Sequence, residues 1–184
     1  RDVFRSSLVS WCVGNHEFEW GDGADGEYTQ YYLGLLAPPD PSAPAPNYRQ
    51  ITLGAVRILV LDSETDYEAS LDDPEGPQRQ WFEAALAETS RDDAIRTTIV
   101  AFHRPLICFG KHRIMRDRLA WMHPLFLEHH VSLVLCGHNH AYERFERDGL
   151  NYVTDGGGGA LLYSVTKQLE EGTITEEEQS WPVS

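Results

Sequence analysis

The chain has 184 residues, and 41% of them are hydrophobic, which is ordinary for one globular domain with a sizeable core. Its 29 acidic residues against 15 Lys and Arg give a formal net charge of −14, which would repel nucleic acid and anionic membrane surfaces. Because no apolar stretch is long enough to cross a bilayer either, we expect one domain over residues 1–184 with no nucleic-acid partner and no transmembrane segment.

The first half of the chain predicts strands joined by long loops. Residues 8–13 form an apolar run typical of a strand, and the run stops at the turn Gly-Asn-His-Glu of residues 14–17. A loop rich in Gly, Asp and Glu follows at residues 21–27. The segments "RQITLG" (49–54) and "VRILVLD" (56–62) predict a pair of strands that turns at Gly54, the second of them apolar enough to be buried.

The second half alternates helices with apolar strands. Residues 77–88 carry apolar side chains at helical spacing behind a proline, which predicts an amphipathic helix. "TTIVAFH" (97–103) and "VSLVLCGHNH" (131–140) predict buried strands, and residues 116–130 predict a helix interrupted or kinked near Pro124. This alternation indicates an α/β architecture with sheets covered by helices.

The cysteines indicate thiols rather than a disulfide framework. There are three, an odd number, and both Cys12 and Cys136 lie in apolar runs just before a glycine turn. We therefore expect free, buried thiols.

Metal-capable side chains stand at the ends of three of the predicted strands. Asn15 follows the first, His103 ends the second, and His138 and His140 end the third. Because the carboxyl ends of parallel strands meet at one edge of a sheet, these side chains could converge on one site. Imidazole nitrogens and an amide oxygen suit zinc, iron or manganese, and histidines two residues apart can face two neighbouring metals.

Each of these residues also has an ordinary structural interpretation. Asn15 alone would be a turn residue, and His103 alone would be a hydrogen-bonded core histidine. His129 and His130, at a predicted helix end, are typical of solvated or capping residues. A metal site is favoured because a metal-capable side chain recurs at the ends of three separate predicted strands.

The motifs resemble those of the calcineurin-like metallophosphoesterases. "GNHE" (14–17), "AFHRP" (101–105) and "GHNHAYER" (137–144) occur in the order that this family has, and the "AYER" extension is most similar to the purple acid phosphatase branch. "YVTDGGGGA" (152–160) is similar to the family's closing Thr-x-Gly-Gly stretch. The resemblance spans nearly the whole chain and implies a four-layer αββα sandwich of two mixed sheets flanked by helices.

The resemblance also implies a metal-ligand set. Two metal ions would lie side by side, one held by Asn15, His103 and His138 and the other reached by His140. Zinc, manganese and iron all remain candidates. Such a pair would clamp a small phosphorylated substrate and activate a water molecule, and it would let an acidic protein bind an anion.

Two further histidines would face the substrate. By resemblance His16 is a hydrogen-bond donor or leaving-group acid, with Glu17 as an orienting partner. His112, in "CFGKHR", matches a substrate-side histidine, although the ordinary interpretation is a solvated loop residue.

One part of the family pattern is absent from this chain. The family's early Asp motifs, and the Tyr that the purple branch adds, should precede "GNHE", but only thirteen residues stand before Gly14. We therefore expect the C-terminal part of a catalytic domain, with its N-terminal strands missing, less stable than the intact domain and incomplete as an enzyme.

The sequence leaves the reaction open within this fold. Hydrolysis of phosphate monoesters, as in acid phosphatases, is the leading hypothesis. A phosphodiesterase or nucleotidase, or a scaffold without turnover, are the alternatives. Members of the purple branch are often secreted, which is the one indication of a compartment.

Overall fold

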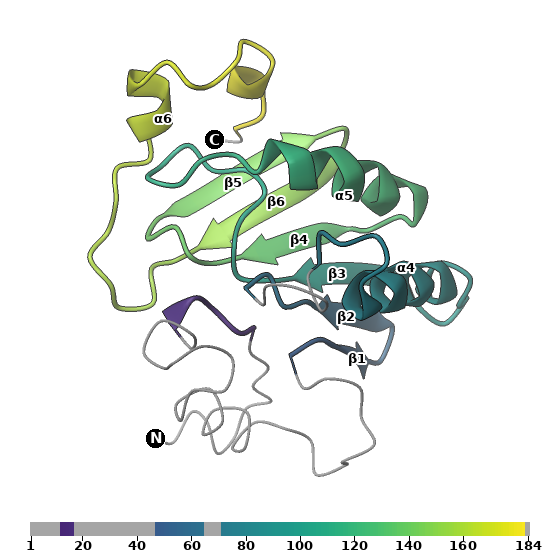
Figure 1. Cartoon of the computed structure of the whole chain (residues 1–184). Coiled ribbons are helices and arrows are strands. Elements are labelled where there is room, and N and C mark those ends of the chain that lie inside the picture. Colours follow the sequence, from purple (N-terminus) through teal and green to yellow (C-terminus); the bar gives the residue numbers. More distant parts are fainter. Residues whose placement is uncertain (1–11, 17–46, 65–70, 183–184) are drawn as a thin grey trace.

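The computed structural model describes residues 12–16, 47–64 and 71–182 (Figure 1). The expected strand at residues 8–13 lies mostly outside these ranges, and its last residues, 12 and 13, are not paired in a strand. The acidic loop at residues 21–27 and Glu17 also lie outside them.

These residues build one six-stranded sheet in the order β1-β2-β3-β4-β6-β5. The neighbours β2, β3, β4 and β6 are parallel, while β1 and β5 run antiparallel at the two edges. The carboxyl ends of four strands therefore share one edge of the sheet. The strands are β1 Arg49–Leu53, β2 Val56–Val60, β3 Thr97–Ala101, β4 Leu133–Cys136, β5 Tyr142–Arg147 and β6 Leu150–Asp155.

Two tight hairpins form the sheet's edges. The expected pair β1–β2 turns at Gly54, whose φ of 59° lies in the left-handed region that glycine adopts without steric cost. The pair β5–β6 was not predicted. Its two-residue turn is Asp148-Gly149, with φ of 51° and 79°, as the favoured hairpin turns require. An Asp-Gly pair between two short strand-like segments is the sequence signal that would have identified this hairpin.

Both expected helices are present. Helix α4 (Pro77–Thr89) begins with Pro77 at its first turn, where the missing N–H costs no hydrogen bond. Helix α5 (Arg116–Glu128) is continuous through Pro124, so the predicted interruption is absent. The proline leaves the carbonyl of Ala120 without its helical donor, but both residues lie on the exposed side, where water can satisfy that carbonyl. A short α6 (Lys167–Glu170) and the 3₁₀ helix η2 (Glu178–Ser180) follow β6.

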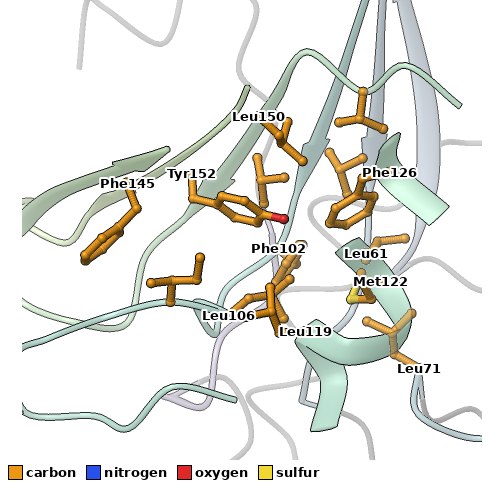
Figure 2. Close-up of a cluster of buried hydrophobic side chains, with 14 of the residues drawn as sticks. Leu61, Leu71, Phe102, Leu106, Leu119, Met122, Phe126, Phe145, Leu150 and Tyr152 are labelled. Carbon is orange, nitrogen blue, oxygen red and sulfur yellow. The ribbon is translucent and has the colours of Figure 1, made fainter. Parts of the chain in front are cut away.

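The two long helices cover the same face of the sheet. Phe82 of α4 and Phe126 of α5 are fully buried and meet edge to face, with ring centroids 6.2 Å apart. Figure 2 shows Phe126 and Met122 of α5 in one cluster with Leu150 and Tyr152 of β6.

No described helix has the length and apolar character needed to span a membrane.

The opposite face of the sheet is also apolar. Ile58, Ile99 and Leu133 stand side by side on β2, β3 and β4 and are only partly buried, and Leu135 is 37% exposed. Strands that are apolar on both faces are typical of sheets buried between two layers. The α/β class and the helix-covered mixed sheet are thus confirmed, and the outer face is the side on which a second sheet of the expected sandwich would pack.

The three cysteines are free thiols, as expected, but of the three only Cys108 is buried, while Cys12 and Cys136 are half-buried. Burial raises the pKa of Cys12 to about 11 and that of Cys108 to about 12, so both are uncharged near neutral pH.

Candidate active site

A cavity of about 650 Å³ lies where the loops after β3, β4 and β6 meet residues 12–16. Figure 1 shows these segments at one edge of the sheet, where the parallel strands end. The cavity is lined by all six residues predicted from the sequence, namely Asn15, His16, His103, His112, His138 and His140. Residues up to 125 positions apart are thus brought together, and the parallel strands β3 and β4 place His103, His138 and His140 at the same edge.

Three atoms able to bind a metal ion converge within this cavity, namely Nε2 of His103, Oδ1 of Asn15 and Nδ1 of His138, and we call them the donor triangle. Nε2 of His103 lies 2.9 Å from Oδ1 of Asn15 and 3.1 Å from Nδ1 of His138. The third side of the triangle, from Nδ1 of His138 to Oδ1 of Asn15, is 3.0 Å. Ligands bound at about 2.1 Å to one ion lie about 3.0–3.4 Å from each other, so the triangle has the size of a metal-binding face.

The triangle combines two imidazoles with an amide. Among the described residues, no group of three or more His, Cys, Asp and Glu side chains is arranged to hold a metal ion. Asn15 is therefore essential to this set, because without its oxygen only two ligands would converge.

Arg104 occupies the other side of the His138 ring. Its Nε donates to both carboxylate oxygens of Glu64, at 3.0 and 2.9 Å, and its Nη1 lies 3.3 Å from Nε2 of His138. A guanidinium can only donate, so in this arrangement Nε2 of His138 accepts and Nδ1 carries the ring proton. Burial raises the pKa of Glu64 and the Arg104 charge opposes that rise.

The electrostatic environment keeps His138 neutral. Its pKa is lowered to about 3, first by burial and then by the neighbouring His112, Arg104 and His103. The pKa of His112 is also lowered, first by burial and then by the charges of Lys111 and Arg104. Neutral imidazoles are the form that binds metals.

The turn after β4 is held in a strained conformation. His138 has a φ of 62°, which is uncommon for a residue with a side chain and occurs often at functional sites. Behind the turn, a Cβ on Gly156 would lie 1.9 Å from the carbonyl oxygen of Asn139. Gly156 also donates its N–H to the carbonyl of Ala141 at 3.0 Å, so the backbone after β6 supports the turn directly.

His140 points to a different part of the cavity from His138. Its Nδ1 lies 3.1 Å from the carbonyl oxygen of Leu161, and its ring stacks on Tyr163 with centroids 4.3 Å apart. Because a carbonyl only accepts, Nδ1 carries the proton and the lone pair is on Nε2. Such a hydrogen bond fixes the tautomer in the way that metal-binding histidines generally require.

The two predicted substrate-side histidines line the cavity from different segments of the chain. His112 packs on His138 with ring centroids 3.9 Å apart, so it is part of the cavity wall and not a solvated loop residue. His16 is exposed and lines the cavity from the segment that carries Asn15.

Four cavity residues with polar side chains were not singled out from the sequence. Arg104 and Lys111 are the cations among the described lining residues, Asp155 is the carboxylate, and Tyr163 forms part of the wall. Arg104 and Lys111 are next to predicted site histidines, and their charge was a usable signal. Tyr163 lies in a segment with no motif and enters the site through its contacts with His140, His112 and Lys111.

The profile of the calcineurin-like phosphoesterases matches residues 4–142, well over half of the chain. The chain belongs to the calcineurin-like phosphoesterase family. Purple acid phosphatase 18 of Arabidopsis thaliana is 32% identical to this phosphoesterase over 149 residues, covering 77% of the chain and 32% of the relative. An uncharacterized protein of Mycobacterium tuberculosis is 34% identical over 146 residues, covering 72% and 27%.

The phosphoesterase fold is also found in a solved structure. A purple acid phosphatase from yellow lupin seeds matches with a TM-score of 0.69 at 20% identity, over 94% of this chain and 33% of that one. These similarities place the chain in the purple acid phosphatase branch, as the motifs predicted, and confirm the metallophosphoesterase fold. The phosphoesterase chain spans about a third or less of the length of each of these proteins.

Proposed function

We propose that this chain carries the substrate-binding half of a two-metal centre that hydrolyses phosphate monoesters. Asn15, His103 and His138 would hold one ion, and Nε2 of His140 would reach the other. The observation that carries the proposal is the donor triangle, whose three sides measure 2.9, 3.1 and 3.0 Å. Membership of a phosphoesterase family supports the reaction class.

The residues fit a bound ion after one change of protonation. An ion at Nδ1 of His138 requires the ring proton to move to Nε2, where it would face Nη1 of Arg104. Two donors cannot share that contact, so ion binding would release Nη1 of Arg104. Because Arg104 already lines the cavity, its released N–H could donate to a phosphate oxygen.

The other side chains have roles that follow from their positions. When bound, the two ions would neutralise charge on the phosphoryl oxygens and activate a water molecule. His16 would donate a hydrogen bond or proton to the leaving oxygen, which is worth about 10²–10⁴-fold in rate for a placed general acid. Lys111 and Arg104 would add positive charge where the substrate binds, against the formal net charge of −14.

The test separates the metal ligand from the proton donor. Zinc, manganese and iron are titrated into the wild-type chain and into Asn15→Ala and His16→Ala, and the bound metal is measured by elemental analysis after desalting. We expect Asn15→Ala to weaken metal binding about tenfold or more, because it removes one of three donors. His16→Ala should leave metal binding unchanged. Equal loss of metal in both variants would overturn this division of roles.

The same preparations test the substrate class. Hydrolysis of p-nitrophenyl phosphate is compared with that of bis(p-nitrophenyl) phosphate. Preference for the monoester supports the proposal, and preference for the diester favours a phosphodiesterase of the same fold. Two ions bound with no hydrolysis of either ester would indicate either a scaffold without turnover or the incomplete enzyme that the sequence predicts.

A further inference from the structure

The loop that carries Lys111 and His112 into the cavity is held by two buried polar side chains. The backbone N–H of Phe109 donates to Oε1 of Glu143 at 2.7 Å, and the N–H of Lys111 donates to Oδ1 of Asn139 at 3.3 Å. Loop N–H groups that are buried need such partners, because an unpaired one is costly. The two acceptors therefore determine where this loop lies.

Glu143 belongs to β5, a strand at the edge of the sheet. Its side chain nevertheless points inward, since the residue is only 6% exposed. Burial raises the pKa of Glu143, and hydrogen bonds from the backbone at Phe109, from Asn139 and from the backbone at Gly110 act against that rise. Burying a carboxylate costs free energy, and the N–H donors around Glu143 offset part of that cost.

Asn139 connects Glu143 to the candidate metal turn. It is fully buried between His138 and His140, and its Nδ2 donates to Oε2 of Glu143. The loop lies directly on this side chain, because a Cβ on Gly110 would be 2.4 Å from Nδ2 of Asn139. One side chain thus contacts both the turn that carries the histidines and the loop that carries His112.

We propose that Glu143 and Asn139 are positioning residues that fix the 109–112 loop, so that His112 stays against His138 and Lys111 stays at the cavity wall to bind a phosphate group. This proposal rests on the proposed function, because it takes phosphate as the ligand. A second anchor acts from the other side, where the N–H of Gln168 donates to the carbonyl of Phe109 at 2.8 Å. The loop would therefore lose only part of its support when Glu143 is changed.

The test uses a variant and its compensating partner. Glu143→Gln keeps the volume but turns one acceptor oxygen into an NH₂ group that faces an N–H donor. In the double variant Asn139→Asp with Glu143→Gln the amide and the carboxylate exchange places, so the amide of residue 143 can donate to the carboxylate of residue 139. The net charge stays that of the wild type. Glu146→Gln, an exposed carboxylate on the same strand, is the matched control.

Two readouts are measured on the full 184-residue chain. Amide hydrogen exchange at Phe109 and Lys111 reports on the loop, and calorimetric titration with inorganic phosphate after metal loading reports on the cavity. For Glu143→Gln we expect about tenfold faster exchange at these two amides and about tenfold weaker phosphate binding, with unchanged metal content. The double variant should recover both, and Glu146→Gln should change neither.

The outcomes distinguish this inference from the proposed function. Unchanged exchange in Glu143→Gln, or a double variant as impaired as the single one, would overturn the positioning role. Faster exchange with unaltered phosphate affinity would overturn it as well, because the loop would then be held for stability alone. A wild-type chain that binds metal but no phosphate would overturn the proposed function and with it the role in phosphate binding, while the exchange data would still decide whether the pair holds the loop.

Discussion

Gly156 is the residue at which the backbone approaches the candidate metal turn most closely among the described glycines. A Cβ there would lie 1.9 Å from the carbonyl oxygen of Asn139 and 3.0 Å from Cα of His140, both backbone atoms. Backbone cannot rotate aside as a flexible side chain can, so the turn itself would have to move.

We expect Gly156→Ala to displace this turn and to weaken metal binding about tenfold, with a loss of about 1–3 kcal/mol in the free energy of unfolding. Denaturant unfolding and metal titration measure the two effects. Gly158→Ala is the matched control, because Gly158 lines the same cavity and nothing lies within 4 Å of its Cβ position. Similar behaviour of the two variants would contradict the steric argument.

At the scale of elements, α5 is tied to the C-terminal 3₁₀ helix η2 by a charged pair. Nε and Nη2 of Arg116, at the start of α5, each donate to an oxygen of Glu178 at 2.8 Å. The N–H of Thr175 donates to the same carboxylate at 2.7 Å. Burial acts to raise the pKa of Glu178, but these hydrogen bonds outweigh it and the pKa lies below its usual value.

A lowered carboxylate pKa in the folded state gives stability that is present above the unfolded pKa and is lost as the pH falls through the folded one. We therefore expect Glu178→Gln to lower the free energy of unfolding by about 1 kcal/mol near neutral pH, a value reduced by the partial exposure of Arg116. The difference from wild type should begin to shrink as the pH falls below the usual carboxylate pKa of about 4.5, and it should disappear once the pH is below the lowered pKa of the folded state.

Thermal unfolding at several pH values measures this difference. Glu176→Gln removes a neighbouring carboxylate that is exposed, and it should melt like the wild type throughout. A destabilisation by Glu178→Gln that is the same at pH 3 and pH 7 would contradict an electrostatic origin.

For the molecule as a whole, the distribution of charge and apolar surface is uneven. The formal net charge is −14, yet the candidate site contributes Arg104 and Lys111 to its wall. The sheet face opposite the helices is apolar, and Leu135 stands on it next to Ala101 and Val153 in the strand register. Partly exposed apolar side chains in adjacent strands favour association with another surface.

We expect Leu135→Lys to weaken self-association of the chain by about tenfold or more, because it replaces apolar surface by a charge at the centre of this face. Light scattering at several protein concentrations measures the association. Leu53→Lys is the control, since Leu53 is 45% exposed at the end of the edge strand β1 and lies away from that face's centre. A wild-type chain that stays monomeric at high concentration would contradict the expectation.

The sequence alone determined the features that depend on neighbours in the chain. Strands, helices and the turns after them are local, so Asn15, His103, His138 and His140 could be recognised at the ends of predicted strands, and apolar periodicity identified α4 and both central strands. Family motifs added His16 and His112, and the cavity contains all six. The interruption predicted near Pro124 is absent because the unpaired carbonyl faces solvent, which a local rule does not include, while the alternative of a kink there stays a prediction.

Only the tertiary structure decided which side chains meet. The donor triangle joins residues that are 35, 88 and 123 positions apart, and the Glu143 contact with Phe109 spans 34. Such distances depend on strand order, register and packing, which bring side chains together across the sheet edge. That is why the sequence could name the ligand types, while the contact of Arg104 with His138, the stacking of Tyr163 on His140 and the support of the 109–112 loop required the fold.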